Sequence, residues 1–147
     1  MTFGIPTTMM EEHEELHNEL KKATIMRGAV GKAAKHVAEV LHPHFEKENE
    51  LALPIIGVTR ELGEGKASED YSKALELFER FRPEYENMLK EHEEIVNALE
   101  KLEAAARKVK NRGVLKFAHE LKLHAKTEED LTYPAVLMAG RLLKKPQ

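Results

Sequence analysis

The apolar positions of the chain recur with the period of an α-helix in four separate segments. The clearest segment begins at Phe78, from which apolar or aromatic residues and one histidine follow in steps of three and four as far as Val109. This spacing puts one side chain per turn on the same face, which is typical of the buried stripe of a bundle helix. Aromatic residues are only 5% of the chain, and β-branched residues do not alternate with polar ones. The pattern predicts an all-α protein.

Three further stripes complete the set of helices. They run through Met9, His13, Leu16, Leu20 and Ala23; through Val30, Ala33, Val37, Val40, His44, Glu48, Leu51, Ile55, Val58 and Leu62; and through Val114, Phe117, Leu121, His124, Glu128, Leu131, Ala135, Met138 and Leu142. Glycine-containing segments at 27–31, 63–68 and 111–113 separate the helices. Such short connections predict antiparallel neighbours in an up-down-up-down four-helix bundle, formed by a single domain over residues 1–147.

Prolines and capping residues define the expected irregularities of these helices. Four prolines fall inside or near the ends of the helices, at Pro43, Pro54, Pro83 and Pro134. Each removes one backbone hydrogen bond, so kinked or terminated helices are expected. Pro54 and Pro134 both lie six residues after a glutamate on the stripe, which predicts an equivalent bend in each half. Thr7 or Thr8, and Ser68, are the predicted N-caps.

Polar residues occupy the stripes at positions that repeat about eighty residues along the chain. The repeated residues are His13, His44 and Glu48 in the first half, and His92, His124 and Glu128 in the second. In each half the second histidine and the glutamate are four residues apart, so both side chains project from one helix face about one turn apart. The repeat predicts four imidazoles and two carboxylates facing the interior of one bundle.

A metal centre explains these buried polar residues best. An unpaired buried carboxylate costs several kcal/mol or more, and no lysine or arginine occupies the stripes to neutralise Glu48 or Glu128. The chain has no cysteine, which excludes thiolate ligands, and the nitrogen and carboxylate set suits iron, manganese or zinc. Two carboxylates that bridge, with coordination positions left over, favour two octahedral, redox-capable ions. The alternative, a bundle without metal, leaves both buried glutamates without a cation to neutralise them.

These motifs resemble those of the hemerythrin family, in its broader HHE cation-binding branch. The matching motifs are Glu12-His13, His44-xxx-Glu48, Leu51-Ala52-Leu53-Pro54, Glu91-His92, His124-xxx-Glu128-Glu129 and Leu131-Thr132-Tyr133-Pro134. The resemblance implies a four-helix bundle holding a non-haem di-iron centre, with an exchangeable position for a small ligand such as oxygen. It implies that Glu48 and Glu128 bridge the two irons. It further implies that His13 and His44 bind one iron, and that His92 and His124 bind the other.

The chain departs from the pattern of oxygen-carrying hemerythrins in two places. Those proteins have a second histidine four residues from the first on the third helix, whereas Val96 follows His92 by four here. An extra open position at one iron is therefore expected, unless His17, four residues after His13, supplies the fifth histidine. The family's spacing on the last helix points to Glu129, but Glu128 alone lies on the stripe and mirrors Glu48.

Other site assignments follow from the same stripes. Tyr85 lies two turns before His92 on its stripe and either packs in the core or lines the site. The remaining histidines, His36, His42 and His119, lie off the stripes and are predicted to be solvated. A ferritin-like di-iron site is not predicted, because Leu121 lies three residues before His124, where that site needs a glutamate.

Composition narrows the class of protein further. The formal net charge is −3 with both signs mixed, so neither a nucleic acid nor a membrane surface is an expected partner. Residues 1–8 lack the pattern of a secretion signal and no apolar run is long enough to span a membrane, so a cytoplasmic protein is expected. Two functions remain open. One is binding or sensing of oxygen, nitric oxide or peroxide, and the other is a di-iron enzyme that removes peroxide or reactive nitrogen species.

Overall fold

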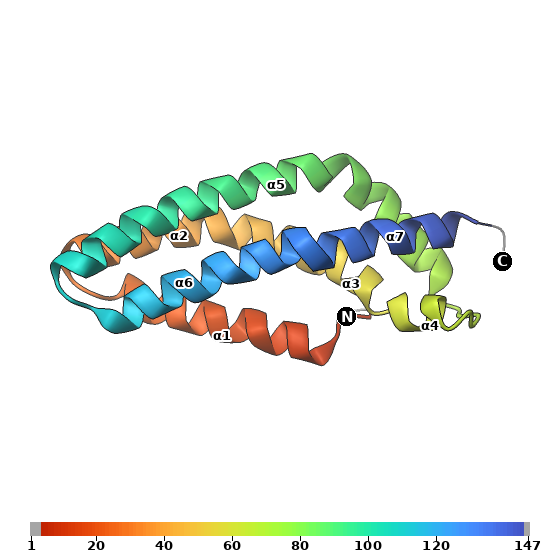
Figure 1. The fold of residues 1–147 in the computed structure, drawn as a ribbon, viewed down its shortest axis with the longest axis horizontal. Coiled ribbons are helices and arrows are strands. Elements are labelled where there is room, and N and C mark those ends of the chain that lie inside the picture. Colours follow the sequence, from red (N-terminus) through yellow and green to blue (C-terminus); the bar gives the residue numbers. More distant parts are fainter. Residues whose placement is uncertain (1–3, 146–147) are drawn as a thin grey trace.

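The protein is helical along nearly all of its length, as the computed structural model shows for residues 4–145 (Figure 1). The elements are α1 (Thr7–Thr24), α2 (Gly28–Lys47), η1 (Glu48–Ala52), α3 (Leu53–Ile56), α4 (Thr59–Gly63), α5 (Tyr71–Lys108), α6 (Arg112–Thr127), η2 (Glu128–Thr132) and α7 (Tyr133–Lys144). The elements η1 and η2 are short π-helical segments. No strand occurs among the described residues, and the all-α prediction is confirmed. Residues 1–3, part of the segment inspected for a secretion signal, lie outside the described residues.

The helices form four antiparallel arms (Figure 1). The arms are α1, the continuous α2–η1–α3, the long α5, and the continuous α6–η2–α7. Helix α1 contacts α2 and α6, and α5 also contacts α2 and α6, so the arms close into the predicted up-down-up-down bundle. The short α4 lies in the connection from α3 to α5. Within residues 4–145, no helix has the length and apolar character needed to cross a membrane.

The apolar core is divided into two main clusters with polar residues between them. One cluster contains Leu16, Phe45, Ile95 and Leu121, and the other contains Leu51, Met88, Tyr133 and Val136, each with further neighbours. On three of the four arms the buried residues of the two clusters are separated by five to eleven residues. Glu48, His92, His124 and Glu128 lie in these stretches. His44 precedes Phe45 at the edge of the first cluster, and His13 lies three residues before Leu16. The candidate ligands therefore lie between two apolar clusters, which limit their contact with water.

The π-helical segments rotate the helices that follow them. The backbone N–H of Leu53 donates to the carbonyl of Glu48, and that of Tyr133 donates to the carbonyl of Glu128, five residues earlier in each case. A proline follows directly, at Pro54 and Pro134. Since proline lacks the N–H of a regular turn and its ring presses on the carbonyl four residues earlier, a widened turn accommodates it. The two prolines thus mark equivalent features in the two halves.

The extra residue in η2 corrects the predicted stripe of the last arm. Leu131 and Met138, expected to be buried, are 67% and 68% exposed. The buried positions of the arm after Glu128 are Tyr133, Val136, Ala139, Gly140 and Leu143. Five residues of an α-helix turn a side chain away from its starting face, but one π-turn returns the fifth residue to it. Tyr133 consequently takes the inward position on which Leu131 was expected.

The helix ends differ from the predicted caps. Thr7 lies inside α1, and neither α1 nor α5 has a side-chain N-cap. The hydroxyl of Ser68 instead accepts from the backbone N–H of Asp70 in the turn before α5. The true side-chain cap is Asn111, which accepts from the backbone N–H of Val114 at the start of α6. Caps of this kind decide where a helix begins rather than which face it buries.

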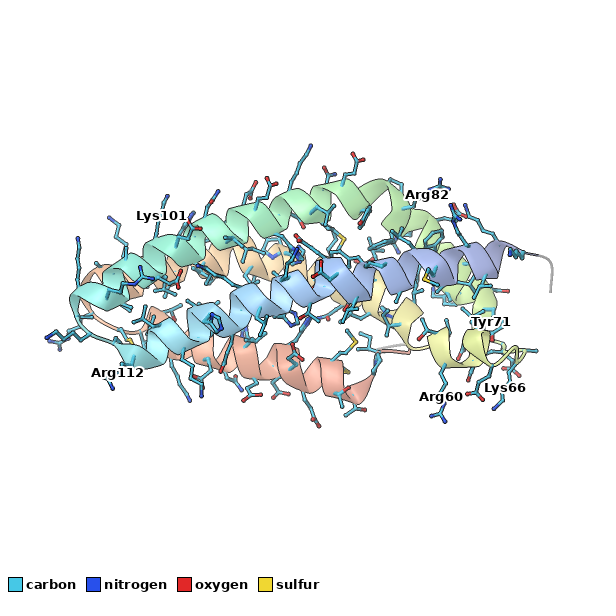
Figure 2. All side chains as sticks on the ribbon, viewed as in Figure 1. Arg60, Lys66, Tyr71, Arg82, Lys101 and Arg112 are labelled. Atoms are coloured by element: carbon cyan, nitrogen blue, oxygen red, sulfur yellow. The ribbon has the colours of Figure 1, made fainter. Side chains whose placement is uncertain are left out.

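The long helix α5 is not straight. It contains Pro83 in its interior and bends visibly in its N-terminal part, near the labelled Arg82 (Figure 2). The proline removes one intrahelical hydrogen bond, which accounts for the bend as predicted. Beyond the bend the helix carries Met88, His92 and Ile95 along the centre of the bundle, where all three are buried.

Candidate metal centre

The six repeated polar residues meet at the centre of the bundle. His13 comes from α1, His44 from the last turn of α2, His92 from α5 and His124 from the last turn of α6. Glu48 and Glu128 are the first residues of η1 and η2. Five of the six residues are at most 6% exposed, and the His124 side chain is 9% exposed. Each of the four arms therefore contributes at least one donor to a largely buried site.

The donors form two groups that share both carboxylates. His44 and His92 lie together, with their Nε2 atoms 2.9 Å apart, and His13 and His124 lie together, with Nε2 atoms 3.2 Å apart. Two nitrogens bound at right angles to one ion, each about 2.1 Å from it, are separated by about 3 Å. The nitrogen spacing within each group therefore suits one metal ion per group.

This grouping differs from the pairing of His13 with His44 that the family resemblance implied. His13 shares its group with His124, and His44 shares its group with His92. The reason lies in the packing of the arms, because α1 contacts α6 while α2 contacts α5. Each group therefore contains one histidine from the first half of the chain and one from the second half.

Each glutamate presents one oxygen to each group. Glu128 Oε1 lies 3.2 Å from His92 Nε2, and its Oε2 lies 3.2 Å from His124 Nε2. Glu48 Oε2 lies 3.5 Å from His44 Nε2, and its Oε1 lies 3.7 Å from His13 Nε2. This is the disposition that two carboxylates need to bridge a pair of ions.

Several polar atoms in this site lack a hydrogen-bond partner. Glu48 Oε1 and Glu128 Oε2, both facing His13, are buried without one. In the described part of the chain, the ion pairs of these two glutamates involve only histidines and no lysine or arginine. Because an unsatisfied buried carboxylate oxygen is costly, the donor set fits a pair of cations.

Carboxylates outside the two groups orient three of the four imidazoles. His44 Nδ1 lies 2.8 Å from Glu91 Oε1, and His92 Nδ1 lies 3.2 Å from Glu129 Oε1. His124 Nδ1 contacts a carboxylate oxygen of Glu12. When Nδ1–H donates to a carboxylate, the neutral ring turns its Nε2 lone pair inward, as metal-binding histidines usually do.

The structure also separates the roles of Glu128 and Glu129, which the sequence left as alternatives. Only Glu128 belongs to both groups, while Glu129 is half-buried and reaches the outer nitrogen of His92. Its place beside the site follows from the helix, since adjacent residues point about 100° apart. Glu128 is therefore the candidate for the bridging position, and Glu129 lies where it orients His92.

Tyr133 is a site residue that the sequence analysis did not identify. Its hydroxyl donates to Glu48 Oε2 at 2.6 Å and lies 3.3 Å from His44 Nε2 and 3.2 Å from His92 Nε2. The side chain is fully buried, and its ring stacks on that of His92. The hydroxyl oxygen thus sits among the donors of one group as a fifth donor of that group would. The signal that could have revealed it is Pro134, which marks the π-turn.

The two halves of the repeat differ at the residues that flank the bridging glutamates. Five residues after Glu128 comes Tyr133, but five residues after Glu48 comes Leu53, which is fully buried and offers no donor. The His44–His92 group accordingly has a phenol that the His13–His124 group lacks. The site is asymmetric even though its glutamates and histidines are duplicated.

The same asymmetry extends to the outer partners. The residue after Glu128 is Glu129, which serves His92, whereas the residue after Glu48 is Asn49. Asn49 is exposed, and His13 Nδ1 is buried without a hydrogen-bond partner. His13 is instead held by stacking on Phe45, with ring centroids 4.1 Å apart and planes 4° from parallel. The least supported imidazole of the site is therefore His13.

Burial and mutual contact displace the pKa values of the groups at this site. Burial lowers the pKa of His44 and His124, but the nearby carboxylates of Glu128 and Glu48 outweigh it and raise these values to about 10 and about 9. Burial and the charge of Glu128 raise the pKa of Glu48 to about 7. Burial also opposes ionisation of Glu128, yet its contacts with Glu48 and the surrounding histidines hold its pKa well below the usual range. In the metal-free protein, protons on the imidazoles thus balance the buried carboxylates.

Other candidate residues lie outside the two groups. His17 belongs to neither group and stacks on His42 with ring centroids 4.9 Å apart, so the structure does not place it among the candidate donors. Tyr85 packs edge-on against the ring of Tyr133, which makes it a packing residue. The predicted exposure of His36 and His119 agrees with the structure, where both are exposed.

Comparison with known proteins identifies the class. The sequence model of the hemerythrin HHE cation binding domain matches residues 4–136. The chain belongs to this family, and the His/Glu groups described above are its candidate cation site. Neither curated proteins nor solved structures gave a match to the chain.

Proposed function

We propose that the protein carries a non-haem di-iron centre that binds a small ligand such as oxygen, nitric oxide or peroxide, for sensing, storage or handling of iron and oxygen. The observation that supports it most directly is the arrangement of Glu48 and Glu128. Each offers one oxygen to each of two histidine pairs, which is how carboxylates bridge two ions. Iron is favoured over zinc because the donor number exceeds four and the hard phenol oxygen of Tyr133 joins one group.

The exogenous ligand is assigned to the group of His13 and His124. This group has two imidazoles and two carboxylate oxygens, and Leu53 stands where the other group has Tyr133. An octahedral ion there retains two positions that the protein does not fill, whereas the ion at His44 and His92 retains one.

The first test is the metal content of the protein. Protein produced in iron-containing medium and purified without chelator is expected to hold two iron ions per chain. The reduced, oxygen-free form is then mixed with oxygen, nitric oxide or peroxide while the visible spectrum is recorded. A spectral change that reverses when the ligand is removed supports binding. Protein that holds no transition metal, and takes none up after unfolding and refolding with iron, contradicts the proposal.

A second candidate function is removal of peroxide by turnover at the same centre. It is favoured by the two unfilled positions at the His13–His124 group and by a pocket of about 790 Å³ whose wall includes His13. Repeated addition of peroxide distinguishes the two functions. Turnover predicts continued loss of peroxide with release of oxygen, whereas binding predicts consumption of no more than a few equivalents.

Tyr133 is expected to bind or support only one of the two ions. In Tyr133→Phe the affinity for one ion should fall by about 10- to 100-fold, the range typical when a supporting group of a metal site is lost. The ferric form should also lose the visible phenolate-to-iron absorption that a coordinated tyrosine produces. Metal titration against a competing chelator and visible spectroscopy measure the two effects.

Tyr85→Phe is the matched control, because Tyr85 contacts the Tyr133 ring but no candidate ligand. It should leave both the affinity and the spectrum unchanged. If Tyr133→Phe keeps the visible band while its affinity falls, Tyr133 acts only by donating its hydrogen bond to Glu48. If neither property changes, Tyr133 has no part in metal binding.

A further inference from the structure

A surface pocket lies beside the candidate centre. It has a volume of about 790 Å³ and lies between α1, the α2–η1–α3 arm and α5. Its wall includes His13, a member of the centre, and Phe45, which stacks on the His13 ring. It is therefore a route by which a small species approaches the His13–His124 group from outside the bundle.

Two further histidines line the same pocket. The rings of His17 from α1 and His42 from α2 are neighbours, with centroids 4.9 Å apart and planes at 27°. Two imidazoles bound to one ion through nitrogens at about 2.1 Å, at angles between 90° and 110°, place their ring centroids about 4.5 to 5.2 Å apart. The observed separation falls in this range. In the described part of the chain neither ring has a hydrogen bond or an ion pair, so their nitrogens remain available.

Carboxylates accompany both histidines. Glu14 lies three residues before His17 on α1, and Glu46 lies four residues after His42 on α2, so each carboxylate shares a helix face with its histidine. Both glutamates are exposed and line the pocket. An exposed glutamate side chain can rotate to supply an oxygen donor beside the two imidazoles. Nitrogen donors of this kind select transition-metal ions over calcium or magnesium.

We propose that His17 and His42, together with Glu14 or Glu46, form a third cation site that takes one divalent transition-metal ion at the mouth of this pocket. From there the ion passes along the pocket to His13 and into the centre. Binding at the third site stands independently of the function proposed above, whereas delivery into the centre rests on it. The third site thus gives His17 a role that is separate from the centre.

Zinc titration of the untagged, metal-free protein tests binding. The wild type is expected to bind three zinc ions per chain by calorimetry, and His17→Ala/His42→Ala two. The matched control is His36→Ala/His119→Ala, which removes two exposed histidines elsewhere and should bind three. The exposed His42→Ala alone should also lose the third equivalent, which covers the case in which the double variant folds poorly.

The stoichiometry separates failure of this proposal from failure of the di-iron proposal. A wild type that binds two ions, both retained in His17→Ala/His42→Ala, overturns the third site only. A wild type that binds one ion, lost in that variant, overturns the two-ion centre only. Three ions in His17→Ala/His42→Ala also overturn the third site.

The rate of iron loading tests delivery. With limiting Fe²⁺ added to metal-free protein, His17→Ala/His42→Ala is expected to fill its centre about tenfold more slowly, at the low end of what local capture of an ion contributes to association rates. Its final content should remain two ions per chain. Equal loading rates in the variant, the wild type and the His36→Ala/His119→Ala control overturn delivery by this route.

Discussion

Glu128→Ala is expected to abolish binding of both metal ions. Glu128 gives one oxygen to the His44–His92 group and the other to the His13–His124 group, so the substitution removes a donor from each. It also leaves the two cations to repel each other with only the Glu48 carboxylate between them. Binding to each group should weaken by more than a thousandfold, since the loss of one supporting partner outside the donors alone costs about 10- to 100-fold.

Glu129→Ala is the matched control for this substitution. Among the described donors of the centre, Glu129 forms a hydrogen bond only with the outer nitrogen of His92, so its loss should lower the affinity of one ion by about 10- to 100-fold and leave the other ion bound. Metal content after gel filtration and titration against a chelator measure both effects, and circular dichroism verifies that each variant is folded. A greater loss of metal in Glu129→Ala than in Glu128→Ala would move the bridging position by one residue.

The helical stripes were sufficient to predict most of the architecture. A period of three to four residues is maintained through α5, and His92 falls on it as regularly as Met88 and Ile95 do. A polar residue that keeps the register of a buried stripe must itself be buried, whatever the tertiary details. For this reason the sequence was sufficient to predict that all six repeated residues are buried in a bundle. It was also sufficient to predict the number of helical arms.

The prediction of buried positions was wrong where the last arm changes from α-helix to π-helix. Leu131 was expected inside and is exposed, while Tyr133 was passed over and lies at the centre of the site. Both errors have one cause, the π-turn after Glu128, which shifts the register by one residue. Periodicity cannot detect a local change in its own period. The sequence feature that marks it is Pro134, because the same residue occurs at the same distance in the other half, at Pro54.

The pattern of buried positions could not predict which histidines share a group, for a different reason. The buried stripe predicts the helix face on which His13 lies. It does not predict which residues of the other arms lie at the same level along the bundle axis. That level depends on where α1 begins and on which arms are neighbours, and the structure places His124 beside it. For the same reason His17, on the neighbouring turn, is directed to His42 and the surface pocket.

Removal of the metal ions is expected to destabilise the protein, and more so as the pH rises. His44 and His124 have pKa values near 6.5 in the unfolded chain, and about 10 and 9 in the folded, metal-free protein. A raised histidine pKa stabilises the folded state fully below pH 6.5, and this stability is lost as the pH rises through the folded values. The raised pKa of Glu48, about 7, acts in the same direction, because its stabilisation fades as the pH rises from 4.5 through 7.

The metal-free protein should therefore lose on the order of 7 kcal/mol of its unfolding free energy between pH 6.5 and 10, at about 1.4 kcal/mol for each unit of pKa shift. The loaded protein should not show this loss, since metal ions bind the neutral imidazoles and replace the protons. With free metal at a thousand times the dissociation constant, each filled site adds about 4 kcal/mol.

Urea unfolding followed by circular dichroism, at pH 6.5, 8 and 9.5 with and without metal, measures this difference. His119→Ala, which removes an exposed histidine that belongs to neither donor group, should keep the wild-type slope. His44→Gln should flatten the slope of the metal-free protein, because glutamine carries no titrating proton and leaves Glu128 with one cationic partner fewer. A metal-free stability that stays level or increases from pH 6.5 to 9.5 would show that protonated imidazoles do not neutralise the buried carboxylates. The charge balance that supports a two-cation centre would then need another explanation.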